Sequence, residues 1–295
     1  MDLWSKELLL NKREDGMFVA MTTNSDVFAY SKDGINWTTG TLPQQGYWYS
    51  ITHGEGKFVA ISNNNVGYCV CSEDGITWEK YKLPVSSYWN GVCYGQGKFV
   101  AFTTSRTYAA YSEDGINWVE TNLPTGHQWN QVAYGNGKFI ITSNNSIGIL
   151  YSEDGITWQN YPALNNLSWQ AIIFAQGKFV SIKYTDSDIA AYSTDGLNWT
   201  ETKLPITGRW SKLAYGKGRF VGISYGGTEF VYSDDGINWY KSNSIEKQLW
   251  IDVTYGNGKF VAVSNYRFAY SEDGVNWIAY NRPSSIDWRS ITYGG

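Results

Sequence analysis

The sequence has few of the residues that stapled secreted domains and hydrolytic sites depend on. Its 295 residues include three cysteines and two histidines. Cys69, Cys71 and Cys93 are too few for a disulfide framework, so we expect them to be core thiols. No apolar run approaches the ~20 residues that span a membrane. The first ten residues also lack the basic segment and long apolar run of a signal peptide. We therefore expect a chain made in the cytoplasm, without membrane insertion.

Charge of either sign is scarce as well. The chain has 23 Lys and Arg against 27 Asp and Glu, a formal net charge of −4. This near-balance provides no electrostatic basis for binding nucleic acid. Aromatic residues are abundant instead, with 15 Trp, 23 Tyr and 12 Phe. Such a composition predicts a large aromatic core.

Two motifs recur together along the chain about every 40 residues, a period typical of propellers and helical solenoids. The first, Ser-x-Asp-Gly-x-(Asn/Thr)-Trp, occurs seven times. The second, Trp-x-x-(Ile/Val/Leu), follows each copy of the first. The aspartates of the first motif are Asp33, Asp74, Asp114, Asp154, Asp195, Asp235 and Asp273.

Each repeat has the pattern of four short strands. In the repeat that starts at Trp129, we expect strands at 129–134, 139–142 and 148–151, and a fourth that starts near Thr157. The β-branched and aromatic runs and the frequent glycines disfavour helical repeats. The sequence therefore predicts an all-β, seven-bladed β-propeller with four-stranded blades.

The two ends of the chain hold complementary parts of one repeat. Residues 288–293 have the pattern of a first strand, and residues 16–22 that of a second. We expect the C-terminal strand to join the N-terminal blade and close the ring, which leaves no open edge. Residues 13–295 then form one domain and residues 1–12 a cap or linker stub. In a competing register, Leu8–Leu10 provide the first strand of that blade, but they lack the Tyr-Gly-x-Gly turn.

The run Ser-Glu-Asp-Gly-Ile-Asn-Trp at 112–118 and its six counterparts resemble the Asp-box, or BNR, repeat of sialidase-like propellers. Those boxes usually have one residue between Asp and Gly, whereas here Gly follows Asp in all seven copies. The repeats also resemble those of tail-fibre and tail-tip proteins of bacteriophages. The first resemblance implies a propeller fold, and the second implies a chain displayed on a phage-like particle, with other tail or scaffold proteins as partners.

The Asp-Gly pair of each box is typical of a hairpin turn, where Gly adopts positive φ and Asp accepts hydrogen bonds from turn amides. Seven carboxylates on seven separate turns cannot converge on one centre. We therefore interpret them as structural and not as catalytic acids or one shared metal site; a metal ion bound at individual turns is the alternative. The cation that ends each Gly-x-Gly-Lys turn is expected on the same face. These cations are Lys57, Lys98, Lys138, Lys178, Lys259 and, by substitution, Arg219.

The opposite face differs from blade to blade and is the candidate for binding, since loops on a rigid scaffold commonly carry function. Its loops are predicted at 44–47, 85–88, 125–128, 165–168, 206–209, 245–248 and 284–287. The residue after each first-strand Trp should reach the mouth of the central channel, with Gln131, Lys212 and Asp252 one step deeper. Those seven residues are Tyr49, Asn90, Asn130, Gln170, Ser211, Ile251 and Arg289.

Amides and arginine beside aromatic rings suit sugars, because hydroxyls need polar partners and the apolar sugar face packs on a ring. Alternatively, the Trp residues pack between blades and the polar residues only hydrate a channel. The candidate ligand-binding residues are Tyr88, Asn90, His127, Asn130, Gln131, Gln170, Arg209 and Arg289. We expect substitution of Asn130 and Gln170 by Ala to remove binding and leave the melting temperature nearly unchanged.

The sequence favours a non-catalytic module for a glycan or cell-surface receptor, with no cofactor and no metal. One alternative is a scaffold that binds proteins. The other is a glycan-cleaving enzyme, but the Arg-Ile-Pro motif of sialidases is absent. Arg106, Arg209 and Arg289 could approach the variable face, yet no Glu has a matching context. Neither histidine, His53 nor His127, belongs to a recognisable catalytic grouping.

Overall fold

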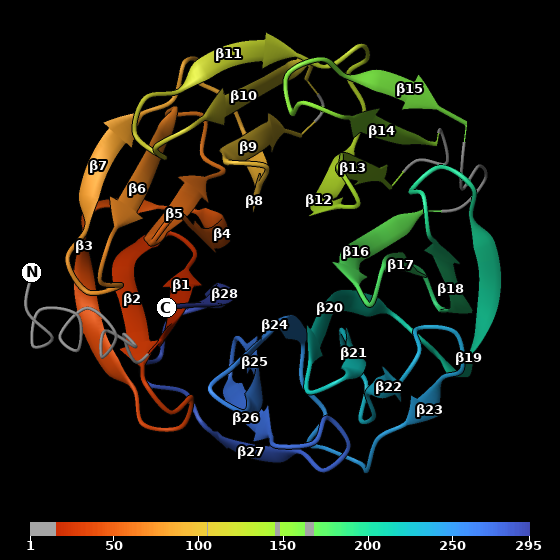
Figure 1. Cartoon of the computed structure of the whole chain (residues 1–295). Helices are drawn as coiled ribbons and strands as arrows, with labels where there is room; N and C mark the ends of the chain where they lie inside the picture. The colour runs from red at the N-terminus through yellow and green to blue at the C-terminus, as the bar shows by residue number, and fades with distance from the viewer. Residues whose placement is uncertain (1–15, 105, 145–147, 163–167) are drawn as a thin grey trace, which may run out of the picture.

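The computed structural model describes residues 16–104, 106–144, 148–162 and 168–295. These residues form seven antiparallel sheets of four strands each, arranged as a ring (Figure 1). In the described part of the chain there is no helix, and so none that could cross a membrane. The prediction of an all-β, seven-bladed propeller is confirmed. Residues 1–12, the proposed cap, lie outside the described residues, as do Leu8–Leu10.

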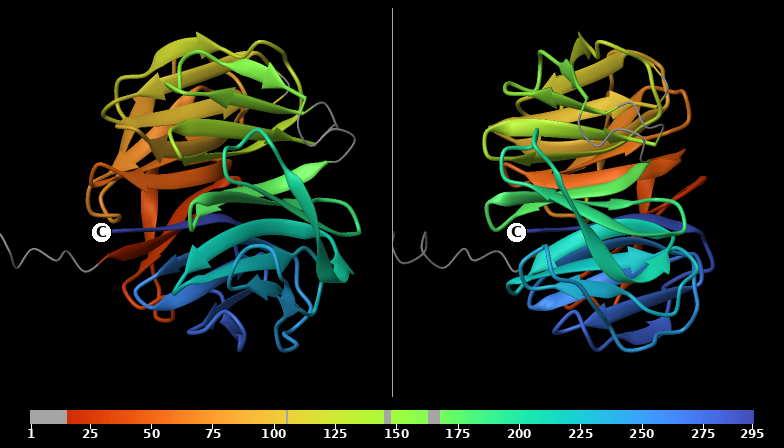
Figure 2. Two further views of the ribbon diagram at one scale, coloured as in Figure 1. Left: turned by 45° about the vertical axis from the view of Figure 1, so that its right-hand side comes forward. Right: turned by 90° about the vertical axis from the view of Figure 1, so that its right-hand side faces the viewer.

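Each blade has one strand beside the central channel and three strands further out (Figures 1 and 2). From the inside outwards, the blades are blade 1, β28 (Trp288–Gly294), β1 (Met17–Thr22), β2 (Ser25–Ser31) and β3 (Thr38–Gly46); blade 2, β4 (Trp48–Gly54), β5 (Lys57–Ser62), β6 (Tyr68–Ser72) and β7 (Glu79–Lys82); blade 3, β8 (Trp89–Gly95), β9 (Lys98–Thr103), β10 (Tyr108–Ser112) and β11 (Val119–Asn122); blade 4, β12 (Trp129–Gly135), β13 (Lys138–Ser143), β14 (Ile149–Ser152) and β15 (Gln159–Tyr161); blade 5, β16 (Trp169–Ala175), β17 (Lys178–Lys183), β18 (Ser187–Ser193) and β19 (Thr200–Gly208); blade 6, β20 (Trp210–Gly216), β21 (Arg219–Ser224), β22 (Val231–Ser233) and β23 (Tyr240–Lys241); and blade 7, β24 (Trp250–Gly256), β25 (Lys259–Ser264), β26 (Arg267–Ser271) and β27 (Ile278–Asn281).

The ring closes as the sequence predicts. Strand β28 pairs antiparallel with β1, with Phe18 opposite Tyr293 and Ala20 opposite Ile291. The last strand of the chain is therefore the innermost strand of the first blade. This pairing leaves no unpaired inner strand in the ring.

The fourth strand of blade 4 starts at Gln159, directly after the predicted start near Thr157 and Trp158. One detail of the predicted strands is wrong. In blades 1 and 5 the segments predicted as loops at 44–47 and 206–209 lie largely within long fourth strands. There the pairings of Ser25 with Gly46 and of Ser187 with Gly208 extend the ladder toward the next blade.

The Asp-box side chains hold their turns by hydrogen bonds. In the first box, Oδ1 of Asp33 accepts hydrogen bonds from the backbone amides of Ile35 (2.9 Å) and Asn36 (2.8 Å). The Asn36 side chain donates to Oδ2 at 2.7 Å. Partial burial raises the pKa of Asp33, but the hydrogen bonds from Asn36 and Ile35 outweigh it and lower that pKa to about 2. These contacts support the structural interpretation of the boxes.

Both turns of each blade lie on one face, as expected. Nζ of Lys178 in blade 5 donates to the carbonyl oxygen of Asp235 in the box of blade 6 at 2.8 Å. Nη1 of Arg219 makes the same contact with Asp273 of blade 7 at 2.6 Å. In the Gly-x-Gly-Lys turns both central residues have positive φ, for example 45° at Asn136 and 74° at Gly137. This is the geometry of a type I′ hairpin, which matches the twist of the strands.

The core lies between the blades. The seven first-strand Trp side chains are all at most 2 % exposed, so they pack between sheets. Close inter-blade approach also explains the glycine that ends most inner strands. A Cβ on Gly135 of blade 4 would lie 1.9 Å from Cγ of Phe174 in blade 5. Cys69 and Cys71 are buried and free, and Cys93 is half-buried and free.

Candidate functional site

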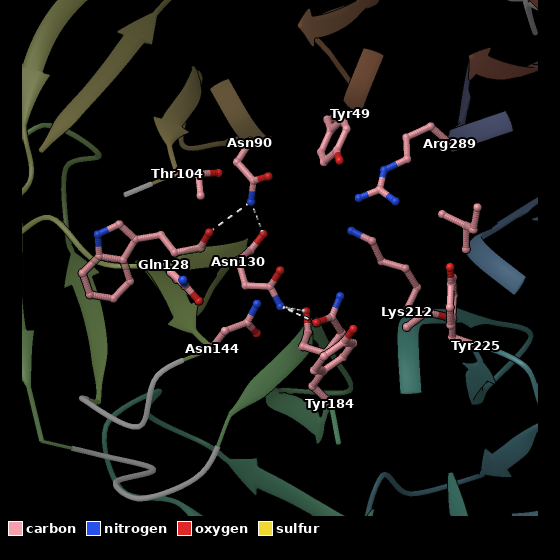
Figure 3. A pocket seen from close by; sticks show the side chains of 14 residues that line it. Tyr49, Asn90, Thr104, Gln128, Asn130, Asn144, Tyr184, Lys212, Tyr225 and Arg289 are labelled. Carbon is pink, nitrogen blue, oxygen red and sulfur yellow. Dashed lines mark hydrogen bonds between the residues drawn. The ribbon is translucent and has the colours of Figure 1, made fainter. Parts of the chain in front are cut away.

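A cavity of about 370 Å³ opens at the mouth of the central channel, on the face opposite the Asp boxes (Figure 3). All seven inner strands contribute to it, each through the residue that follows its Trp. Four further residues come from loops between second and third strands, and Gln128 precedes β12. The lining residues are Tyr49, Asn90, Thr104, Gln128, Trp129, Asn130, Asn144, Gln170, Tyr184, Ser211, Lys212, Tyr225, Ile251 and Arg289.

A repeated backbone irregularity directs these seven side chains into the channel. In blade 4, Trp129 pairs with Ser143 and Gln131 with Thr142, so Asn130 is an extra residue in its strand. The same shift follows the first-strand Trp in the other blades, including Arg289 of β28 opposite the Met21–Thr22 step. Such β-bulges re-aim side chains and are common beside functional sites.

Several of the bulge residues also tie neighbouring blades together. Nδ2 of Asn90 donates to the carbonyl oxygens of Trp129 and Asn130 at 3.0 Å each. Nδ2 of Asn130 donates to the carbonyl oxygens of Trp169 (3.1 Å) and Gln170 (2.7 Å), and to Oε1 of Gln170 (2.9 Å). Oγ of Ser211 donates to the carbonyl oxygen of Trp250 at 2.8 Å.

These ties correct one expectation from the sequence. Replacing Asn130 by Ala removes a donor that serves two carbonyl groups of the next blade. Leaving such buried acceptors without partners costs roughly 1–3 kcal/mol. The double substitution of Asn130 and Gln170 therefore changes stability as well as the cavity, and its melting temperature is not expected to stay unchanged.

Charged side chains gather on the other side of the channel, in blades 6, 7 and 1. Burial lowers the pKa of Lys212, with the Asp252 carboxylate acting in the opposite direction and Arg289 lowering it further. Burial raises the pKa of Asp252, against the influence of Lys212 and of two backbone amides. Those amides, from Val253 and Ile291, donate to the carboxylate at 2.9 and 3.0 Å. Asp252 thus links β24 to β28 below the cavity.

The predicted site residues separate into several groups. Asn90, Asn130, Gln170 and Arg289 line the cavity together. Gln131 lies deeper, in a channel section of about 320 Å³ that also includes Asn90, Asn130, Lys212 and Asp252.

The other three predicted residues lie outside the cavity lining. Tyr88, 48 % exposed, lines an adjoining hollow of about 480 Å³ with Asn63 and Arg106. His127 packs edge-on against Trp129, with ring centroids 5.7 Å apart. Arg209 is exposed and lines none of these cavities. Its carbonyl oxygen accepts a hydrogen bond from the amide of Tyr225, which does line the cavity.

Four loop residues that line the cavity are not among the predicted site residues, and they share one repeat position. Each comes directly after a second strand. In each, the backbone amide donates to the carbonyl oxygen of the residue before the inner-strand Trp of the same blade, as Tyr184 does to Ser168 (2.9 Å) and Tyr225 to Arg209 (2.6 Å). Counting one residue beyond every second strand would have identified them. They are Thr104, Asn144, Tyr184 and Tyr225.

Acidic and thiol groups do not cluster in the cavity. Its lining contains no Asp, Glu, His or Cys. Across the described ranges, no group of three or more of these residue types is arranged to hold a metal ion. His53 lies at the opposite end of the channel, packed against Phe58 with ring centroids 4.6 Å apart. The chemistry available in the cavity is therefore hydrogen bonding, aromatic packing and positive charge.

No known family model and no curated protein matches this chain. Solved seven-bladed propellers do match it in structure. A streptogramin B lyase superposes with a TM-score of 0.75 at 14% identity, covering 84% of this chain and 87% of that one. The virginiamycin B lyase of Staphylococcus aureus gives 0.72 at 14% identity, over 90% and 91%. YCF48 bound to a D1 peptide gives 0.67 at 13% identity, over 84% and 85%. At such identities the likeness establishes the fold alone.

Proposed function

We propose that this chain is a non-catalytic binding module that recognises carbohydrate on a cell surface through the cavity at the channel mouth. The observation that carries the proposal is a polar cavity at the channel mouth to which all seven blades contribute a side chain. Its volume of about 370 Å³ lies at the lower end of the range of roughly 300–1,000 Å³ typical of ligand sites.

The lining suits sugar hydroxyls and the apolar face of a sugar ring. The wall from blades 3 to 5 presents the amide side chains of Asn90, Asn130 and Gln170. Because the Trp side chains pack between blades, the exposed aromatic surface comes from tyrosines. Tyr184 and Tyr225 enter from the loops and point toward the cavity (Figure 3). Tyrosine combines an apolar ring with a hydroxyl, which is useful at a wet binding surface.

Two features support the absence of catalysis. Glycoside hydrolysis ordinarily uses a pair of carboxyl groups beside the scissile bond, and no carboxyl group lines the cavity. One solved form of the virginiamycin B lyase is a catalytically inactive variant in which a histidine is replaced by alanine. In this chain neither histidine lines the cavity. His53 packs on Phe58, and His127 packs on Trp129.

A single shallow sugar site has a dissociation constant in the millimolar range, about −4 kcal/mol. Presenting several copies together raises the overall affinity without new contacts. We therefore propose display in multiple copies on a phage-like particle, with other tail or scaffold proteins as neighbours, as the setting in which the site works.

Recognition of a protein segment is the second candidate. The hollow beside Tyr88 shares Tyr49, Asn90 and Thr104 with the cavity, so the two adjoin. Propellers of similar structure include YCF48 bound to a D1 peptide and the nidogen/laminin complex. A groove of this kind accepts an oligosaccharide equally well.

A glycan array of the fluorescent, multimerised protein tests the proposed function. Tyr184→Ala and Tyr225→Ala should each reduce binding at least tenfold and retain the melting temperature, because both side chains lie at the rim. Tyr266→Ala is the control, since this exposed tyrosine lies in the corresponding loop of blade 7 but lines no part of the cavity. Absence of binding to every glycan, with capture of peptides instead, would replace the proposal with the protein-binding alternative.

A further inference from the structure

Two cationic side chains face the cavity, and no acidic side chain lines it. Lys212 from β20 and Arg289 from β28 extend toward the same space from adjacent sides (Figure 3). No Asp or Glu belongs to the lining. Within the described residues, neither cation has a carboxylate oxygen within ion-pair distance. The cavity lining therefore carries two cations and no anion, and Asp252, deeper in the channel, is the carboxylate that acts on both.

Arg289 is held in place by a ring. Its guanidinium carbon lies 3.9 Å from the centroid of the Tyr49 ring, a close cation–π contact. Stacking uses the flat face of the guanidinium and leaves its N–H edge available. That edge carries donors in a fixed fork that matches the two oxygens of a carboxylate.

Lys212 lies one residue deeper, where burial penalises its charge. The closest acid in its surroundings is Asp252, whose carboxylate already accepts hydrogen bonds from the backbone amides of Val253 and Ile291. A buried ammonium is costly unless it is paired and hydrogen-bonded. An anion in the cavity would supply this missing partner.

The opposite wall has a different character. The NH₂ groups of Asn90 and Asn130 are used in the ties between blades, so their Oδ1 atoms are the groups left for a ligand. Oε1 of Gln170 accepts from Asn130, which leaves its NH₂ group as a donor. One wall therefore offers neutral acceptors and donors for hydroxyls, and the other offers two cations.

We propose that the sugar bound in this cavity is carboxylated, with its carboxylate between Arg289 and Lys212 and its hydroxyls on the wall formed by Asn90, Asn130 and Gln170. This inference rests on the proposed function and specifies its ligand class. A carboxylate fits because one group can pair with the guanidinium edge and also receive a hydrogen bond from the ammonium.

The test is a glycan array that contains matched pairs of uronic-acid glycans and their neutral counterparts, with sulfated glycans and polyglutamate as further arms. We expect binding to be confined to the carboxylated members. The best of them is then titrated against the wild type and three variants. Lys212→Met and Arg289→Met should each weaken binding at least tenfold. Lys247→Gln removes an exposed cation from the 245–248 loop, which lines none of these cavities, and should have no effect.

Salt dependence provides a measurement that needs no variant. Affinity for the carboxylated glycan should fall as sodium chloride rises, and D-glucuronate should compete in solution where D-glucose does not. Equal binding of neutral or sulfated members would overturn the carboxylate assignment and leave the carbohydrate function standing. No glycan binding at all, or binding of polyglutamate alone, would remove the proposed function and this inference with it.

Discussion

Deletion of β28, residues 288–295, tests the ring closure most directly. The strand contributes Trp288, which is 0% exposed, and Ile291, which is 4% exposed, to the core between blades 7 and 1. Truncating a buried Trp costs about 3–5 kcal/mol and a buried Ile about 2–5 kcal/mol. The backbone ladder with β1 and its inter-blade contacts are lost as well. Oγ of Ser290 donates to the carbonyl oxygen of Trp48 at 3.1 Å, and the amide of Ile291 donates to Asp252 at 3.0 Å.

Together these losses are on the order of 10 kcal/mol. That is as large as the whole stability of an ordinary domain, about 5–15 kcal/mol. We therefore expect the truncated chain to lack a cooperative thermal transition and to elute with an expanded radius in size-exclusion chromatography. A synthetic peptide of residues 286–295 should partly restore the transition when added in excess.

The matched control is the deletion of residues 1–8, which removes the same number of residues and none of the described strands. It should melt within a few degrees of the full chain. If the C-terminal truncation melts as cooperatively as the full chain, ring closure through β28 does not hold the blades together, and the reasoning from its burial is refuted.

Two further predictions concern the Asp boxes. Asp114→Ala should lower the free energy of unfolding by about 1–2 kcal/mol through lost turn hydrogen bonds. Trp118→Ala should lower it by about 3 kcal/mol, because this side chain is only partly buried. Urea unfolding measures both values, and equal values for the two variants would contradict the ranking. In the folded protein the pKa of Asp33 and of Asp273 is lowered to about 2, whereas the unfolded value is ~3.9. The ionised carboxylates therefore stabilise the fold fully above pH ~3.9, and this stabilisation is lost as the pH falls through about 2. Urea midpoints should therefore drop between pH 4 and 2, and flat midpoints over this interval would show that the turns hold without their charges.

Much of the architecture could be predicted because the repeat is local. An Asp-Gly hairpin and a buried apolar strand need only neighbouring residues, so seven copies of them indicate seven blades. The pairing of 288–293 with 16–22 followed from counting which strands each end lacks. The long strands β3 and β19 were mispredicted as ending before the loops, because their length depends on how the outer edge of one blade meets the next.

The candidate site was only partly visible in the sequence. Residues after each Trp, such as Asn130, could be placed at the channel because a strand beginning at Trp has a known direction in the ring. The loop residues Tyr184 and Tyr225 were not assigned to the site, since loop conformation is not set by strand periodicity. The double role of Asn130, as a cavity residue and a tie between blades, depends on a neighbour about 40 residues away.

The sequence by itself determined the number of blades, their closure and the face that varies, because hairpin turns and alternating burial are encoded over a few residues. Only the tertiary structure decided what the variable face contains. A bulge after each inner-strand Trp turns one side chain per blade toward the axis, and the ring brings these seven side chains into one cavity. Lys212 and Arg289 are far apart in the chain, and they face the same space because closure places blades 6, 7 and 1 around one channel.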